Sequence, residues 1–169
     1  MSATNQRDHA TNLAKSNPKK ALDAARKVND PWFRAQALSW VARYTEGDPL
    51  AIASEAAKSA GACEDDYKRS AVRAWEIAAL AERGFAFDAR KRLSEAVRLA
   101  RGVMPMASRS EALILLIQAA LKISREDGLK VNEVLATSCS AEEHWRCKRA
   151  LRDGAKMVGG DLAPRQFFW

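Results

Sequence analysis

Apolar residues, many of them alanine, recur at intervals of three and four positions along most of the chain. This spacing is typical of amphipathic α-helices, whereas β-strands show strict alternation of apolar and polar residues. Alternating runs of Val, Ile and Thr are nearly absent. We therefore predict an all-α fold.

Capping residues and glycines divide this pattern into separate helices. Three starts combine a side chain that caps free N–H groups with a following proline, at Asn17, Asp30 and Asp48. Later starts are predicted from an acidic group and two capping boxes: Glu64, Asp65 and Asp66, Ser108 with Glu111, and Ser140 with Glu143. Stops are predicted at Gly47, Gly61, Gly84 and Gly102. We expect about eight to nine helices, near residues 6–15, 18–28, 31–44, 49–60, 65–82, 86–101, 106–124, 127–137 and 141–158.

Alternate helices resemble one another. A small residue followed by a large apolar one recurs at steps of 37, 38 and 38 residues, at Ala37, Ala74, Ala112 and Ala150. The helices between them share an acidic residue followed by apolar ones, at Asp23, Glu55, Glu95 and Glu133. Two helices per unit and about four units are typical of stacked α-hairpins, which bury their apolar faces only by stacking. The small residues let a neighbouring backbone approach, and the nearly all-apolar helix 106–124 is predicted near the centre of the stack.

With these repeats, residues 17–158 resemble the tetratricopeptide-repeat-like α-solenoids, and Gly47 with Asp48 matches their Gly-Asp between helices. The repeat is longer than the usual 34 residues and the Trp-x2-Leu-Gly-x2-Tyr signature is absent, so HEAT-like stacking and a plain helical bundle stay open. The resemblance implies one α-solenoid domain over 1–169, with a capping segment at 1–16, about four hairpins at 17–158 and an aromatic tail at 159–169. It also implies a curved surface, lined by the first helix of each hairpin, that holds a peptide or protein segment.

Polar and aromatic residues three, four or seven positions apart line one side of these first helices. The candidate partner-binding residues are Trp32, Gln36, Arg43, Arg69, Arg73, Glu76, Glu111, Gln118, Lys122, Trp145, Arg149, Arg152 and Lys156. Arg and Trp are frequent in binding hot spots. The alternative, an ordinary solvated helix face with intrahelical ion pairs, stays open for each residue.

The charge balance favours acidic partners. The chain has 28 Lys and Arg against 21 Asp and Glu, a net charge of +7, and the excess is spread evenly rather than gathered in a basic tail. A basic group on one helix could join the arginines of the last helix in binding phosphates: Arg90, Lys91, Arg98 and Arg101 with Arg149, Arg152 and Lys156. Helical-repeat proteins that bind single-stranded RNA exist, so nucleic-acid binding is the alternative function.

Catalytic and metal-binding signals are weak. Cys139, His144 and Cys147 lie close in sequence, but no fourth ligand is evident, and Cys63 stands apart. An enzyme using Cys147 and His144 is a third hypothesis. We predict no catalytic residues, no metal site and no cofactor. Three cysteines without close pairs suit reduced thiols, and no apolar leader or spanning run occurs, so we expect a cytoplasmic protein without a membrane segment.

The last residues include three aromatics, Phe167, Phe168 and Trp169, whose exposure to water is unfavourable. We predict that this tail folds back to cover the apolar end of the last hairpin. The alternative is a docking peptide that binds a partner or a second copy, which would give self-association. Taken together, the sequence predicts a non-enzymatic scaffold whose basic, Trp-bearing surface binds an acidic protein or peptide. Replacing Arg73 and Arg149 by Glu is then expected to abolish binding with little loss of stability.

Overall fold

The structure, a computed structural model, describes residues 1–139, 141 and 143–169, and in these residues it contains helices and no strand. The all-α prediction is confirmed. The helices are α1 (Ala3–Ala14), α2 (Pro18–Arg26), α3 (Pro31–Tyr44), α4 (Pro49–Gly61), α5 (Asp66–Ala71), α6 (Arg73–Glu82), α7 (Ala86–Ala100), α8 (Met106–Ile123), α9 (Arg125–Cys139) and α10 (Trp145–Gly159). None of these helices is both long and apolar enough to cross a membrane.

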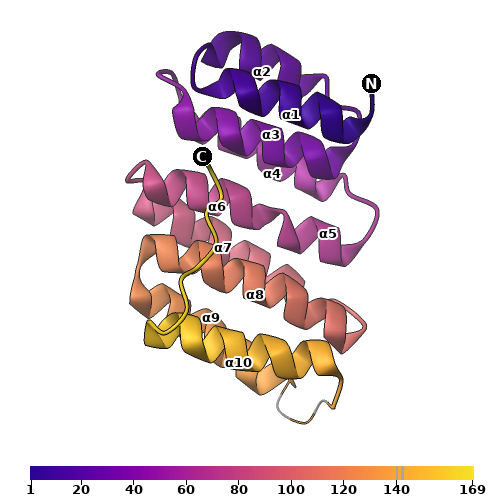
Figure 1. The fold of residues 1–169 in the computed structure, drawn as a ribbon, viewed down its shortest axis with the longest axis vertical. Coiled ribbons are helices and arrows are strands. Elements are labelled where there is room, and N and C mark those ends of the chain that lie inside the picture. The colour runs from indigo at the N-terminus through magenta and orange to yellow at the C-terminus, as the bar shows by residue number, and fades with distance from the viewer. Residues whose placement is uncertain (140, 142) are drawn as a thin grey trace.

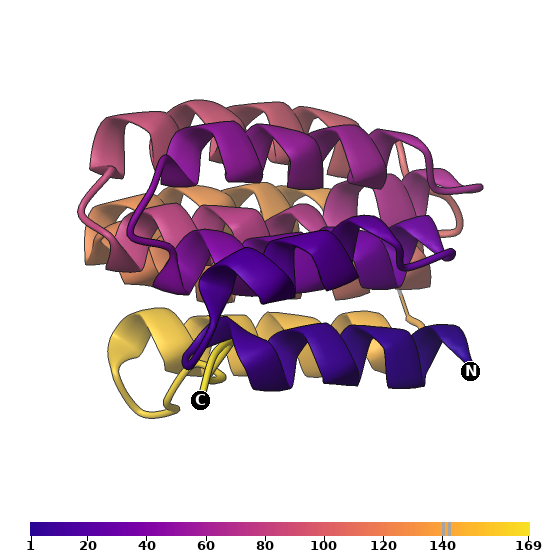
Figure 2. The same cartoon turned by 90° about the horizontal axis from the view of Figure 1, so that it is seen from above.

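Neighbouring helices pack in pairs, and the pairs stack along the longest dimension of the molecule (Figure 1). α1 pairs with α2, α3 with α4, α6 with α7, and α8 with α9, while α10 packs against α8 and α9. The row made of α1, α3, α6, α8 and α10 lies toward the viewer in Figure 1. Seen from above, α1 and α10 project at the two ends of the stack, on the side where the C-terminal segment lies (Figure 2).

Three of the predicted helix starts are confirmed in detail. The side chain of Asn17 accepts from the Lys20 N–H, and the carboxylates of Asp30 and Asp48 each accept from two backbone N–H groups of α3 and α4. Such caps satisfy donors that the first helical turn leaves without partners.

The capping box predicted at Ser108 is wrong, although its helix begins near residue 106 as predicted, and the helix predicted over 141–158 begins later. Ser108 lies inside α8, which begins two residues earlier after Pro105. α10 begins at Trp145, where the ring of His144 accepts from the Arg146 N–H at 3.1 Å. Ser140, the predicted cap of this helix, lies outside the described residues. The helix expected over 65–82 is divided at Val72 into α5 and α6.

The repeated alanines are buried, as expected for close helix packing. Ala37, Ala74 and Ala112 are fully buried and Ala150 is nearly so. α8 packs against five other helices, but α6 lies in the middle of its row (Figure 1). The sequence favoured α8 for the central place because that helix is apolar almost all round, whereas the structure buries two charged residues of α6 as an ion pair.

Candidate functional site

Except for Arg69 on α5, the candidate partner-binding residues lie on one row of helices, and they differ in exposure. Four of them are buried: Gln36, Arg73, Glu76 and Gln118. Five are partly exposed: Trp32, Arg43, Arg69, Glu111 and Lys122. Four on α10 are exposed: Trp145, Arg149, Arg152 and Lys156. The row therefore does not present them as one uniformly exposed surface.

Several of these charged residues form ion pairs between neighbouring helices. Glu82 at the end of α6 accepts from Arg43 of α3 at 2.7 Å and lies 3.8 Å from Nζ of Lys122 on α8. Glu111 of α8 accepts from Arg149 of α10 at 2.5 Å. These pairs connect successive layers of helices. They also compensate the positive charges of Arg43, Lys122 and Arg149, which were expected to attract a partner.

A cluster of charged side chains, buried on α6 and partly exposed on α7, joins these two helices. Arg73 donates to Glu76 and, at 3.2 Å, to Glu95, while Arg92 lies 4.0 Å from Oε2 of Glu76. Glu76 is only 1% exposed, and its Oε2 has no hydrogen-bond partner among the described residues. Burial raises the pKa of Glu76 to about 7, although both arginines oppose the shift. Arg73 and Glu76 therefore contribute to helix packing, and Arg73→Glu is now expected to destabilise the fold.

The C-terminal segment, residues 160–169, folds back across the same row of helices (Figure 1). Gly160 has a left-handed backbone (φ 90°) at the end of α10, a conformation that glycine adopts without strain and that turns the chain back. The segment then passes in front of α8 and α6 and ends beside α3, in agreement with its contacts.

Aromatic contacts hold this segment in place. Phe167 is fully buried and meets the Trp75 ring edge-on at 5.5 Å between ring centroids. Phe168, 7% exposed, contacts Trp40 in the same manner at 5.5 Å. Trp169 also packs edge-on against Trp40, at 4.5 Å, but is 74% exposed. The two phenylalanines are therefore the anchors of the segment, because they lose most of their contact with water.

Polar contacts fix the register of the segment. Gln118 Oε1 accepts from the backbone N–H of Arg165 at 2.9 Å, and the Tyr44 hydroxyl donates to the carbonyl of Trp169 at 3.1 Å. The Arg165 guanidinium lies 4.9 Å from the centre of the Trp75 ring. We call the surface formed by Trp40, Tyr44, Trp75 and Gln118 the inner face.

The tail thus folds back on its own chain, as the sequence predicted, but the surface that it covers was predicted wrongly. Its anchors contact α6 and α3, two and three layers away from α10, and not the end of the last hairpin. The physical reason is that α10 has only one apolar side, which already packs on α8 and α9 through Cys147, Ala150, Gly154 and Val158.

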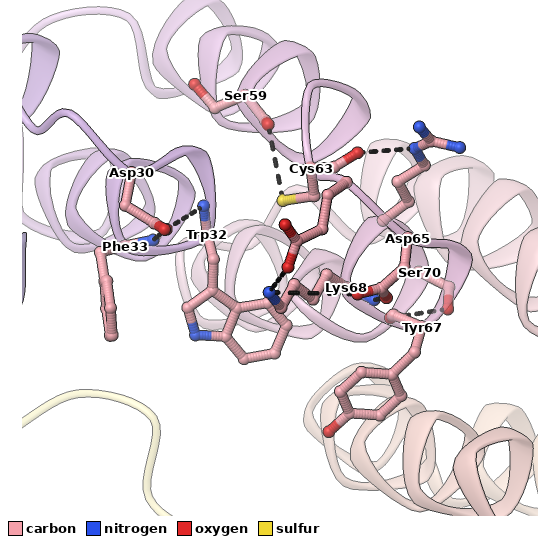
Figure 3. A network of polar contacts seen from close by, with 11 residues as sticks. Asp30, Trp32, Phe33, Ser59, Cys63, Asp65, Tyr67, Lys68 and Ser70 are labelled. Atoms are coloured by element: carbon pink, nitrogen blue, oxygen red, sulfur yellow. Dashed lines mark hydrogen bonds and ion pairs between the residues drawn. The ribbon is translucent and has the colours of Figure 1, made fainter.

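Beside the inner face, a second aromatic group connects α3, α5 and α6. Trp32 stacks with Tyr67 at 6.1 Å and meets Trp75 edge-on at 6.0 Å. Figure 3 shows how Asp30 caps the helix that carries Trp32, and how Tyr67 extends from the start of α5. Trp32 therefore packs against the side of Trp75, which itself contacts Phe167. Among the described residues, Trp32 makes no ring contact with the C-terminal segment.

The candidates for metal binding and catalysis differ in their exposure to water. Cys147 is fully buried, whereas His144 is exposed and caps α10. Burial raises the pKa of Cys63 to about 11, which disfavours a reactive thiolate there. Among the described residues, no group of three or more His, Cys, Asp and Glu could hold a metal ion.

The two basic groups considered for phosphate binding lie on different helix rows. Arg90, Arg98 and Arg101 line a groove of about 430 Å³ between α7 and α9, where Arg90 pairs with Asp127 at 3.0 Å. Arg149 and the other α10 residues lie on the opposite row (Figure 1). The structure therefore does not join them into one basic surface.

Sequence reasoning did not single out Trp40, Tyr44 and Trp75, which contact the C-terminal segment directly. Two signals were available. Trp75 is the large residue after the repeated Ala74, and Trp40 and Tyr44 are four residues apart, on one side of α3. Aromatic residues within a helix are often core residues, so the sequence alone did not distinguish these three from the core. Their contacts with the C-terminal segment are seen only in the structure.

Comparisons with known proteins add no family to this description. No protein-family model matches the chain, and no curated protein and no solved structure matches it either.

Proposed function

We propose that this protein is a non-enzymatic interaction module whose inner face binds a segment of a partner protein. One observation carries the proposal: residues 163–169, which are not helical, lie against α8, α6 and α3 with both phenylalanines buried. A stack of helices that accommodates an irregular peptide segment on one row has the geometry needed for peptide recognition.

The chemistry of the inner face supports this proposal. Trp and Tyr provide large, rigid contact areas, and such residues dominate the binding energy of protein interfaces. Gln118 and Tyr44 add hydrogen bonds to the backbone of the bound segment. The face therefore offers apolar sites for aromatic side chains and polar groups that form hydrogen bonds with the backbone of a bound segment.

The partner is proposed to be a protein or peptide with acidic residues beside its anchoring segment. The net charge of +7 and the exposed α10 residues Arg152 and Lys156 favour such residues electrostatically. Since many charges on the row are paired internally, their contribution is expected mainly in the rate of association and in its salt dependence.

A display selection from a random peptide library tests the proposal. The bait is the full chain carrying Phe167→Ala and Phe168→Ala, which weakens the anchors of its own tail. Peptides are expected to be enriched, and their binding is expected to be lost in a bait that also carries Trp40→Ala. Phe87→Ala is the matched control, because Phe87 is 79% exposed on α7, outside the inner face.

Two outcomes would contradict the proposal. One is that no peptide is enriched by a bait whose far-ultraviolet circular dichroism shows an intact fold. The other is that the bait retains RNA, which is released steeply with salt, while its peptide binding is insensitive to Trp40→Ala. The second result would favour the nucleic-acid function instead.

A further inference from the structure

The contacts of the C-terminal segment define which chemistry the inner face accepts. Phe167 and Phe168 are consecutive, yet each meets a different tryptophan, on α6 and on α3. Two residues before Phe167, the N–H of Arg165 donates to Gln118, and its guanidinium lies over Trp75. The face therefore matches one short pattern: a cationic residue, any residue, and two consecutive aromatic residues.

The segment is also attached to the fold in a way that permits exchange. Asp161, Ala163, Arg165 and Gln166 are exposed. Residues 163–169 form no backbone–backbone hydrogen bond with the helices in the part of the chain that the structure describes. Regions without backbone–backbone hydrogen bonds to their surroundings open at lower free-energy cost than packed helices do. Release of the segment breaks the buried contacts of Phe167 and Phe168 and the hydrogen bonds to Gln118 and Tyr44, but it breaks no hydrogen bond within the described helices.

We propose that the inner face recognises, in trans, an extended protein segment with the pattern Arg-x-Phe-Phe, and that residues 162–169 are an intramolecular ligand which such a segment displaces. This inference rests on the proposed function and specifies the partner of the same face. A second copy of this chain carries the same pattern, so exchange of tails between two copies is one form of the same recognition.

Competition by the tethered segment makes a quantitative prediction. Because the tail is tethered, its effective concentration at the inner face is about millimolar. The tail therefore occupies the face most of the time, and a free peptide binds only to the fraction of molecules in which the tail is released. The apparent dissociation constant equals the intrinsic one divided by the open fraction. Weakening the tail is therefore expected to strengthen binding of a free peptide, whereas damage to the face weakens it.

The test uses a fluorescein-labelled synthetic peptide with the sequence of residues 162–169 and measures its binding to the full chain by fluorescence anisotropy. The chain with Phe167→Ala and Phe168→Ala is expected to bind the peptide at least about 10-fold more tightly than the parent chain. Adding Trp75→Ala to this variant is expected to reverse the gain, whereas adding Phe87→Ala leaves it unchanged. A peptide with both phenylalanines replaced by alanine is expected to compete at least about 10-fold less well.

Two results would overturn the inference: equal affinity of the parent and tail variants, or equal competition by the alanine peptide. The result of the library selection separates this failure from failure of the proposed function. If selected peptides bind the face but lack consecutive aromatics and are not displaced by the tail peptide, only the inference is wrong. If neither selected peptides nor the tail peptide bind, the proposed function is wrong as well.

Discussion

The two sides of α6 are held by opposite kinds of chemistry. Toward α7, the buried pair of Arg73 and Glu76 contacts the partly exposed Arg92 and Glu95. Toward the C-terminal segment, Trp75 meets Phe167 and the Arg165 guanidinium. The two sides differ in what the loss of a contact costs. A buried charge without its partner has a large desolvation penalty, whereas one aromatic side chain in contact with Trp75 can be replaced by another of the same kind.

This difference assigns separate roles to neighbouring residues. The charged side connects helices of the same layer and fixes their positions. The aromatic side carries a segment that is attached by two phenylalanines and by hydrogen bonds to Gln118 and Tyr44, and that forms no backbone–backbone hydrogen bond with the described helices. We infer that stability and recognition are divided between the two sides of one helix, and four substitutions test this division.

The largest effect is expected from Arg73→Ala on the charged side. It leaves Glu76 buried without its main cationic partner, and such changes cost about 3–5 kcal/mol. Urea unfolding followed by circular dichroism measures this loss. A loss below about 1 kcal/mol, the range of exposed ion pairs, would show that the cluster is not a buried structural element.

The second effect is the pH dependence that Glu76 gives to stability. Its pKa is about 7 in the folded protein against a usual value of 4.5, so the folded state holds the proton more tightly. Stability from this group is present below about pH 4.5 and is lost as the pH rises to about 7, by roughly 2–3 kcal/mol. The unfolding free energy is measured at several pH values between these limits. As the pH rises, it is expected to fall less in Glu76→Gln than in the parent chain, or to rise. Parallel profiles for both chains would contradict the burial of an ionisable Glu76.

On the aromatic side, Phe167→Ala is expected to cost about 2 kcal/mol. This is less than the usual 3–5 kcal/mol for a buried phenylalanine, because the segment can detach without unfolding the helices. The measurement combines urea unfolding with proteolysis, in which the C-terminal segment of the variant is expected to be cleaved faster than that of the parent. If the cleavage rate is unchanged and the unfolding free energy falls by about 3–5 kcal/mol, Phe167 belongs to the cooperative core.

The smallest effect is expected from Tyr44→Phe, which removes the hydrogen bond to the carbonyl of Trp169. A neutral hydrogen bond near the surface contributes about 0.5–1.5 kcal/mol. The cleavage rate of the segment is expected to rise slightly while the urea midpoint stays nearly constant. A large shift of that midpoint would mean that Tyr44 supports α3 itself rather than the bound segment.

The helices themselves were predictable because the spacing of apolar residues and the proline-linked caps are local signals. Asn17, Asp30 and Asp48 each needed only the next few residues to be recognised. The repeated alanines also pointed correctly to close helix packing, since Ala37, Ala74 and Ala112 are fully buried.

The inner face was not predictable in the same way, because its contacts join residues far apart in the chain. Tyr44 and Trp169 are separated by 125 positions, and no local pattern connects them. Arg73 and Glu76 were misleading for a related reason: charged residues usually indicate solvent, but here each compensates the other inside the fold. Their burial depends on Arg92 and Glu95 of the next helix.

Nuclear Overhauser contacts of the isotope-labelled full chain, recorded while an unlabelled peptide with the sequence of residues 162–169 is added, test the central claim most directly. We predict contacts between the rings of Phe167 and Trp75 in the free chain, and their replacement by contacts between the peptide and Trp75 as the peptide saturates. Absence of the first contacts, or their persistence at saturating peptide, would contradict the account.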